Sequence, residues 1–584
     1  MGQPQEHSRE ILQQAIDARI KALEESFMES VRVLRLERNA LAPISSLPPE
    51  VLTTIFSLLC SSGKPSNNLQ RIRLSHVCHQ WREIAINQPL LWNHVDFTTL
   101  SSAGAAGTLA RAKSAPLYLE ARMSRNDVRF STFRQEVQAH LPRICHLGVS
   151  AECDDIDRTL GALGSPAPTL ESVSLFSTTE FYRAKASILD TLFDRSAPRL
   201  SWLKLRHCGL SWKWPALKGL KYLEILKPAR KKPKLADWLD ALAEMPDLKT
   251  LILNEATPNA PPFPFDVERI VTLPSLARFT IEGFLEDCVF ALAHLDLPAV
   301  TQLSLDAFCT QLPGSSDVQE LLPYIARYVY GTQHPQPLQS MLIRNNRKCI
   351  DILIWPVPDI GIEVQNLNPP ILLGATLPTR LALSLRSYGI SDTRNYSHLE
   401  LLEWLMTGLP LDGIATLAAQ NLCGRILYER NLAKQFWLHI SPKFPQLRRV
   451  RLSCPTVGGF IEMLLEDSAR PLLPSLTELV VVDASVYDLS SHPLCDALMK
   501  RVEQGVPLEV LDLRMCFREY KWDAQLRELG EIVADVLGPE SYEASNHMRS
   551  LWKPVPLGIF LDDDDRADTE SYTGSDNEEE SDEE

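Results

Sequence analysis

The chain has 584 residues, of which 45% are hydrophobic and 23% charged, and its formal net charge is −15. This length predicts roughly two to four domains, and the composition excludes a predominantly disordered or fibrous chain. Residues 562–584 hold thirteen acidic side chains and one arginine, a contribution of −12, so the rest of the chain carries −3. A nearly neutral body argues against a broad nucleic-acid-binding surface.

Cysteine usage and the absence of targeting signals predict a location inside the cell. Twelve cysteines are scattered without the paired spacing of a metal site. Charged residues (Glu6, Arg9, Glu10) precede any apolar run, so we expect no signal peptide, and no stretch of about 18 apolar residues suggests a membrane span. We therefore expect reduced thiols, a cytoplasmic and/or nuclear protein, and no membrane partner.

Residues 1–43 are predicted to contain one long helix, from Ser8 to about residue 41, ended by Pro43. Apolar residues recur in it close to a heptad spacing, at Ile16, Ile20, Leu23, Phe27, Val31 and Leu34. Two interpretations remain open from the sequence. The helix either self-associates as a coiled coil through residues 8–41, or it folds back on the segment that follows.

Residues 44–97 form the next predicted domain, which is helical and unusually apolar. Pro48 and Pro49 occupy positions where a helix can begin, and Glu50 places negative charge in its first turn. An apolar stripe follows at Val51, Leu52, Ile55, Phe56, Leu58 and Leu59, and a second one at Leu74, Val77, Cys78, Trp81 and Ala85. Residues 47–92 are too few to bury this surface internally, so part of it must be covered by another surface.

The same residues carry a family resemblance. The order Leu47–Pro48, Glu50, Ile55–Phe56, then Cys78, Trp81 and Arg82, and finally Leu91–Trp92 resembles an F-box, over about eight per cent of the chain. The alternative is a plain helical hairpin packed within its own chain. His76, Cys78 and His79 do not suggest a metal site, because a structural site needs four ligands and no second pair lies nearby.

The resemblance implies partners and site residues. In F-box proteins the stripe docks on the Skp adaptor of an SCF-type ubiquitin ligase and, through it, on a cullin scaffold. The corresponding adaptor-binding residues here are Leu47, Pro48, Ile55, Phe56, Leu59, Val77, Cys78, Trp81, Leu90 and Trp92. Among them we expect Phe56 and Trp81 to be the anchors, because large aromatic side chains in desolvated pockets carry most interface energy.

Residues 98–560 are predicted to form an irregular α/β leucine-rich-repeat solenoid. After two short strands at 93–97 and 115–123, the pattern L-x-x-L-x-L, with Ile, Val, Phe or Met allowed, recurs at spacings mostly near the roughly 20–29 residues of such repeats. Proline often precedes the pattern and stops the preceding helix. The pattern begins at Ile144, Leu170, Leu200, Leu220, Leu248, Leu276, Val300, Leu338, Leu447, Leu476 and Leu508.

Details of the repeats give further expectations. Cys208, Cys516 and Asn346 should turn inward at the bend after their strands and bond backbone groups. Residues 345–446 are less regular: 378–385 and 412–419 are degenerate strands if the solenoid continues, and the alternative is a helical insertion. We expect a capping helix within 517–560, because the last repeat must be covered, and a disordered acidic tail from 561 to 584.

No catalytic, cofactor or metal motif is evident. The resemblance, which extends to the large fungal F-box families with an amino-terminal helix before the box, implies a non-catalytic substrate receptor that holds a protein substrate on the repeats. The alternatives are a non-degradative F-box scaffold, or an enzyme with its site in 345–446. The basic run 227–234 is either a nuclear-import signal or phosphate contact, or a solvated loop between repeats. Ser575 and Ser581 precede acidic residues as acidophilic kinases favour, and the alternative is a tail that only aids solubility.

Overall fold

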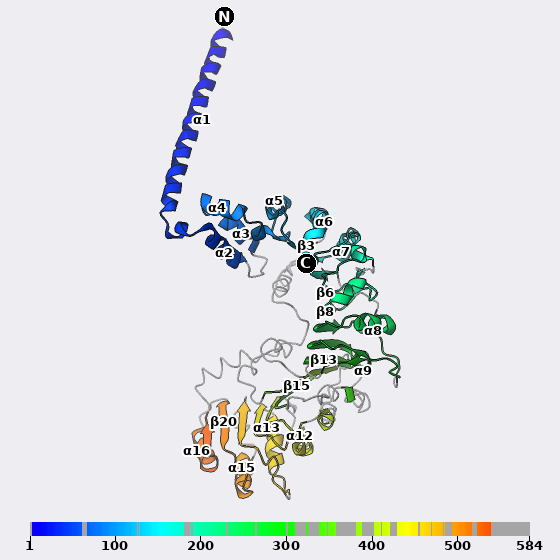
Figure 1. Cartoon of the computed structure of the whole chain (residues 1–584). Helices are drawn as coiled ribbons and strands as arrows, with labels where there is room; N and C mark the ends of the chain where they lie inside the picture. The colour runs from blue at the N-terminus through cyan, green and yellow to red at the C-terminus, as the bar shows by residue number, and fades with distance from the viewer. Residues whose placement is uncertain are drawn as a thin grey trace, which may run out of the picture. The chain divides into compact units, whose positions relative to one another are not determined.

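A computed structural model shows two compact α/β units, Met1–Pro298 and Ala299–Glu584 (Figure 1). It describes residues 3–60, 67–124, 127, 129–179, 187–188, 191–228, 232–262, 265–298, 302–309, 323–324, 338–346, 349–357, 381–387, 402–403, 405–409, 411–420, 429–453, 456–468, 470–482, 484, 493–516 and 522–538. The expected disorder of the tail, the serines at 575 and 581, and the end of the expected capping segment lie outside these residues. In the described part, no helix is both long and apolar enough to cross a membrane.

The first unit begins with helices. The predicted amino-terminal helix is present as α1 (Gln3–Ala40), followed by the short 3-10 helix η1 (Pro43–Ser46). Three helices form the next segment: α2 (Pro49–Cys60), α3 (Asn67–Leu74) and α4 (His79–Ile86). The 3-10 helix η2 (Pro89–Trp92) then leads into the sheet. Helix α2 starts at its proline pair, with Glu50 in the first turn, as the sequence predicts.

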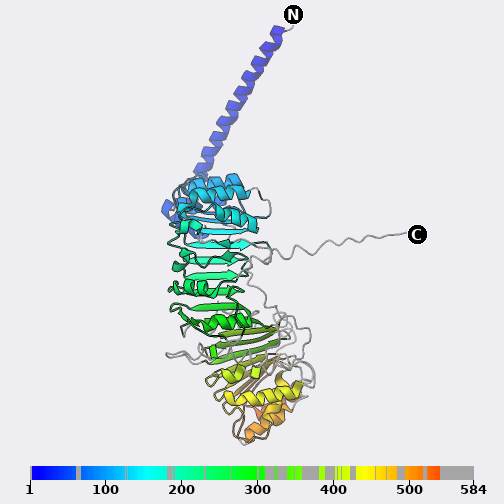
Figure 2. The ribbon, with the colours of Figure 1, turned by 90° about the vertical axis from the view of Figure 1, so that its right-hand side faces the viewer.

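The sheet of the first unit is parallel, and its strands lie in chain order (Figure 2). They are β1 (His94–Asp96), β2 (Leu117–Arg122), β3 (Ile144–Ala151), β4 (Ser172–Ser177), β6 (Trp202–Arg206), β8 (Tyr222–Leu226), β9 (Thr250–Asn254) and β11 (Arg278–Phe284). Two pairs of shorter strands, β5 (Ser187–Ile188) with β7 (Gly209–Leu210) and β10 (Val271–Thr272) with β12 (Leu295–Asp296), are also parallel.

Helices cover one face of this sheet (Figure 1). They are α5 (Ser102–Ala112), α6 (Arg129–His140), α7 (Cys153–Gly161), α8 (Leu235–Ala243) and α9 (Leu285–Ala293), with 3-10 helices η3 (Leu141–Arg143), η4 (Leu192–Arg195) and η5 (Pro215–Gly219) between them. Buried and half-buried residues alternate along β4 and β6. Parallel sheets usually have both faces covered, so a partly exposed second face is a distinctive feature of this unit.

The repeated apolar pattern fixes the register of the strands. Its fourth positions pair from strand to strand in one continuous buried row: Leu147, Val173, Leu203, Leu223, Leu251 and Phe279. A shift by one residue would turn every one of these side chains to the other face, so burial of this row specifies the pairing. Each of the eleven occurrences of the pattern coincides with a strand, which begins two residues after the first position in ten cases and at Ile144 itself in β3.

The sheet of the second unit is less regular. Its strands are β13 (Gln302–Cys309), β14 (Ser340–Asn346), β15 (Cys349–Trp355), β16 (Leu381–Ser387), β17 (Thr416–Gln420), β18 (Arg449–Ser453), β19 (Glu478–Val482), β20 (Val510–Met515) and β21 (Asp535–Leu537). Strand β15 is antiparallel to both β14 and β16, and β16 is parallel to β13. From β14 through β17 to β21 the strands are parallel and in chain order.

The helices described in the second unit include α12 (Glu429–Ile440), the 3-10 helix η8 (Ser441–Lys443), α13 (Thr456–Leu464), α15 (Leu494–Glu503) and α16 (Trp522–Ile532). The strands expected within 378–385 and 412–419 are present as β16 and β17. Strand β15 was not expected, because its sequence, which is apolar apart from Asp351, lacks the repeated pattern. Such a sequence suits a strand covered on both faces, and every residue of β15 is buried.

The expected capping helix is shorter than the sequence suggested. Helix α16 ends at Ile532, and β21 follows it and pairs with β20. Without β21 this edge of β20 would expose its backbone donors and acceptors, and the extended residues of β21 pair with them, which a longer helix could not do.

The cysteines of the repeats are structural, as expected. Cys516 is fully buried, and its Sγ donates to the Val481 carbonyl at 3.3 Å. Cys208 is also fully buried, and burial raises the pKa of its thiol to about 12. A thiol with such a pKa is protonated at neutral pH and is a poor nucleophile. The side chain of Asn346 lies outside the described residues.

Candidate functional site

The three helices at residues 49–86 enclose a small core of their own. Leu52 and Phe56, four residues apart on α2, are buried, and Phe56 is only 1% exposed. The Phe56 ring packs on the half-buried Trp81 of α4 with 4.9 Å between ring centroids. Ala85, one turn further along α4, is fully buried. One side of α2 is therefore already covered by the chain itself.

The end of this segment is anchored to the sheet of the first unit. The indole N–H of Trp92 donates to the Ala85 carbonyl at 2.6 Å, and the Arg111 guanidinium of α5 lies 4.9 Å from the Trp92 ring centroid. The buried Arg71 of α3 donates to the carbonyl of His94 on β1 at 2.8 Å. Buried charge-assisted bonds of this kind hold two elements in a defined geometry.

The adjacent face of α2 is apolar and uncovered. Ile55 lies four residues after Val51, and Leu58 and Leu59 lie three and four residues after Ile55, which places all four along one side of the helix. Val51 is 42% exposed, Leu58 71% and Leu59 53%, and Ile55 is half-buried. A helix of a self-contained domain carries polar residues on its outer face. Helix α2 instead has apolar residues on both its covered and its uncovered faces.

Other exposed apolar side chains lie on the same domain. Val77, just before α4, is 58% exposed, and Leu90 of η2 is 57% exposed. Ile44 of η1 is 41% exposed, while Pro48 is exposed and Leu47 half-buried. Together with the outer face of α2, these side chains make part of the surface of this domain apolar.

The structure therefore divides the ten predicted site residues. Leu59, Val77, Leu90 and Pro48 are exposed; Leu47, Ile55, Cys78 and Trp81 are half-buried; Phe56 and Trp92 are buried. Sequence reasoning did not select Val51, Leu58 and Ile44 as site residues, although they are among the exposed apolar side chains of the domain. For Val51 and Leu58 the sequence did hold an indication, because they lie four and three residues from Ile55 and so share its side of the helix.

A second feature is a row of side chains on the partly exposed sheet face of the first unit. His94 stacks on Tyr118 across β1 and β2 at 4.3 Å, and Trp202 stacks on Tyr222 across β6 and β8 at 5.0 Å. Between these pairs, the ring of His146 lies 2.7 Å from the Ser172 hydroxyl, and burial lowers the pKa of His146. A neutral imidazole thus separates two aromatic pairs on one row of side chains.

The neighbouring rows add charged groups. The Arg206 guanidinium lies 4.5 Å from the centroid of the Phe176 ring, and Lys204 is 3.5 Å from Glu224. Aromatic residues and arginine are the types enriched at protein interfaces. The face therefore combines aromatic and charged side chains.

The basic run 227–234 is only partly described, because residues 229–231 lie outside the description. Lys232 pairs with Asp287 of α9, and its ammonium lies 5.7 Å from the centroid of the Phe284 ring. The second oxygen of Asp287 accepts from the backbone N–H of Ala260 at 2.7 Å. At least one cation of the run thus belongs to the packing between repeats. Nowhere in the described part do three or more His, Cys, Asp or Glu residues gather as a metal site would require.

Comparison with known protein families matches residues 44–98 to the family described as F-box-like. No curated protein matches the chain. F-box proteins are generally non-catalytic adaptors, and an F-box suggests binding to a Skp-type adaptor within SCF-type complexes. Residues 44–98, with their own small core and an uncovered apolar face, are thus an F-box-like domain joined to a larger α/β body.

Proposed function

We propose that the chain is the substrate-recognition subunit of an SCF-type ubiquitin ligase. The uncovered face of α2, with Val77 and Leu90, binds the Skp adaptor, which links the chain to a cullin scaffold. The α/β body, interpreted as leucine-rich repeats of the fungal F-box type, holds a protein substrate. The chain makes or breaks no bond: it raises the local concentration of substrate lysines near a ubiquitin-charged enzyme.

One observation carries the adaptor proposal: α2 has apolar residues on two faces, and its own chain covers only one. Phe56 and Trp92 belong to the covered side, so we assign them the role of holding α2 and η2 in place. Direct contact falls to Leu58, Leu59, Val77 and Leu90, with Trp81 at the edge. Covering large aliphatic side chains removes apolar surface from water and supplies the binding free energy.

The sheet face of the first unit is our candidate for the substrate-binding surface. The repeats present a row of side chains that differs from strand to strand, while the buried row beneath them stays apolar. The aromatic pairs at Tyr118 and Trp202 would contact apolar side chains of the substrate, and Lys204 and Arg206 its acidic ones. Such a receptor would act in the cytoplasm, the nucleus or both.

The adaptor assignment is tested with the double variant Leu58→Asp/Leu59→Asp of the full-length chain. Placing two carboxylates in a desolvated contact should weaken binding of a purified Skp adaptor at least ~100-fold in calorimetry, since interface hot spots cost about 2 kcal/mol or more each. The matched control is Ile270→Asp/Met499→Asp, which changes two exposed apolar residues outside the F-box-like domain. Its affinity should equal that of the wild type.

Full adaptor binding by the Leu58→Asp/Leu59→Asp variant, with an unchanged circular dichroism spectrum, would defeat the assignment. Reconstituted ubiquitination then separates a degradative receptor from a scaffold. Proximity labelling in cells identifies candidate substrates as proteins labelled by the wild type and lost from a Trp202→Ala/Tyr222→Ala variant. A receptor predicts that such proteins are ubiquitinated in the reconstituted ligase, whereas a scaffold predicts that they are bound and left unmodified.

A further inference from the structure

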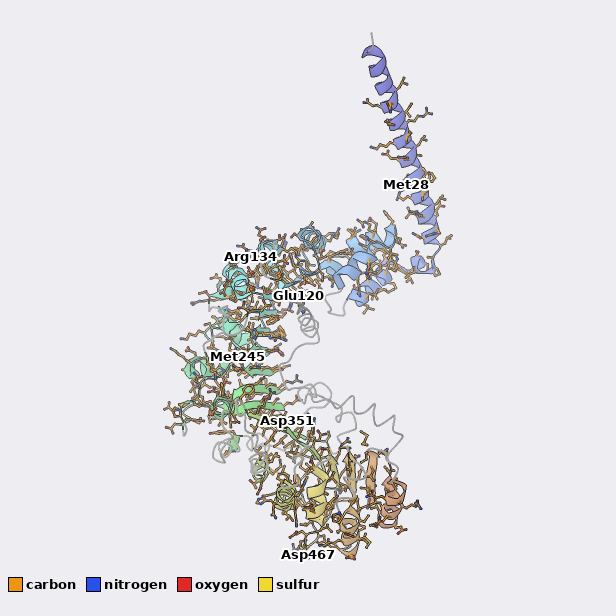
Figure 3. The ribbon with its side chains drawn as sticks, turned by 180° about the vertical axis from the view of Figure 1, so that it is seen from behind. Met28, Glu120, Arg134, Met245, Asp351 and Asp467 are labelled. Atoms are coloured by element: carbon orange, nitrogen blue, oxygen red, sulfur yellow. The ribbon has the colours of Figure 1, made fainter. Side chains whose placement is uncertain are left out.

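Helix α1 carries an apolar stripe that its own chain leaves uncovered. Leu12, Ile16, Ile20, Leu23, Phe27 and Leu34 are between 49 and 67% exposed, and Val31 of the same stripe is half-buried. Figure 3 shows the side chains of α1, Met28 among them, standing out around the helix. The alternative that the helix folds back to bury this stripe is not what the structure shows. Six large apolar side chains in water along one helix call for a partner.

The stripe has a regular period. Its members recur every eleven residues: Leu12, Leu23 and Leu34 form one series, Ile16 and Phe27 a second, and Ile20 and Val31 a third. An eleven-residue repeat corresponds to about 3.67 residues per turn, so the stripe runs nearly straight along the helix instead of winding around it. From Leu12 to Leu34 it extends about 33 Å at 1.5 Å per residue. A straight stripe of this length fits another straight helix.

The charged residues on the two flanks of the stripe are complementary to those of a second copy of α1. On one side Asp17 and Glu24 precede Arg35, so this flank is acidic in its first half and basic in its second. On the other side Arg19 precedes Glu37, which is the opposite order. Two copies of α1 therefore place unlike charges opposite each other whether they align in parallel or antiparallel. Flanking charges of this kind select the partner of a helix.

From the exposed stripe, its straight period and these flanks, we propose that α1 pairs with α1 of a second copy of the chain. The occupant of the stripe is thus another molecule of the same protein. This inference is independent of the adaptor proposal, because it uses residues outside the F-box-like domain. Its consequence is a receptor that carries two F-box-like domains and two substrate surfaces.

The test compares the full-length chain with two double variants of α1. Ile20→Asp/Phe27→Asp places two carboxylates in the middle of the stripe. Met28→Asp/Val33→Asp makes the same kind of change at two exposed apolar residues that lie outside the stripe, one beyond each edge. Both variants introduce two aspartates, which add the same charge and lower helix propensity equally. A difference in mass between the two variants therefore shows the contribution of the stripe itself. Analytical ultracentrifugation over a concentration series gives the mass of each.

We expect the wild type and Met28→Asp/Val33→Asp to be dimeric, and Ile20→Asp/Phe27→Asp to raise the dissociation constant at least ~100-fold. A wild-type chain that stays monomeric up to about 100 μM overturns the proposal, as does a dimer that survives Ile20→Asp/Phe27→Asp. Skp-adaptor binding is measured on the same samples and should be equal in all three. Adaptor binding therefore tests the F-box assignment, whereas the mass of the chain tests the pairing of α1.

Discussion

Two buried aspartates on the sheet of the second unit show how one residue type takes opposite roles. Asp351 of β15 is 1% exposed, and burial raises its pKa despite the nearby Ser384, Arg344 and Arg386. Asp512 of β20 is also buried, which by itself raises its pKa, but bonds from the Arg514 side chain (2.8–3.0 Å) and backbone N–H lower it overall. At neutral pH the ionised Asp351 carboxylate therefore lowers the stability of the folded state, and the Asp512 carboxylate raises it.

Replacing each aspartate by asparagine should therefore move stability in opposite directions. A raised folded pKa means that the folded state binds the Asp351 proton more tightly than the unfolded state, so wild-type stability falls as pH rises from about 4 through that folded pKa. Asp351→Asn should be more stable than wild type at pH 7, with a difference that shrinks towards pH 4.

Asp512→Asn should be less stable than wild type at pH 7, because it loses bonds to Arg514, and its deficit should shrink as acid protonates the wild-type carboxylate. Urea unfolding at several pH values from about 3 to 7 measures both variants: the Asp351→Asn difference changes above about pH 4 and the Asp512→Asn deficit below it. A wild type that is more stable than Asp351→Asn at pH 7 would mean that Arg344 and Arg386 outweigh burial.

At the scale of elements, two glycines on helices of the second unit have opposite surroundings. A Cβ added at Gly459 of α13 would overlap the Cβ of Ala433 on α12, so these helices approach closely because the position has no side chain. A Cβ at Gly530 of α16 would meet nothing within 4 Å. The first glycine allows a contact, and the second only adds backbone freedom to the unfolded chain.

Alanine substitution should separate these roles. Gly459→Ala should cost about 1–3 kcal/mol of unfolding free energy, since overpacking shifts α12 against α13. Gly530→Ala should add about 0.4–1 kcal/mol, because alanine restricts the unfolded chain and fits the helix. Denaturant unfolding followed by circular dichroism measures both. An equal gain in unfolding free energy at the two positions would show that α12 and α13 can move apart at little cost.

The sequence predicts elements well where one physical pattern decides them, and poorly where tertiary context does. The repeated L-x-x-L-x-L pattern locates eleven strands, because its apolar residues must form one buried row. The pattern does not reveal β15, which is buried along its whole length and includes Asp351, or β21, which completes a sheet edge. The same limit applies to α2: spacing identifies an apolar stripe, but only packing shows that Phe56 faces inward and Leu58 outward.

At the scale of the whole molecule, two uncovered apolar surfaces of the described residues lie on separate helices, α1 and α2. The stripe of α1 and the outer face of α2 use different residues, and the sheet face of the first unit uses a third set. Pairing through α1 would bring two substrate surfaces into one assembly. A substrate with two recognition segments would then be held more tightly by two receptors than by one, because the second contact forms at high effective concentration.

The two proposals together predict the composition of the complex with the Skp adaptor, measured by native mass spectrometry. The wild type should give two chains and two adaptors. Ile20→Asp/Phe27→Asp should give one of each, because only the α1 contact is lost. Leu58→Asp/Leu59→Asp should give two chains and no adaptor, because only the α2 face is changed. A variant that lost both contacts at once would show that the surfaces depend on each other, since independent sites contribute additively.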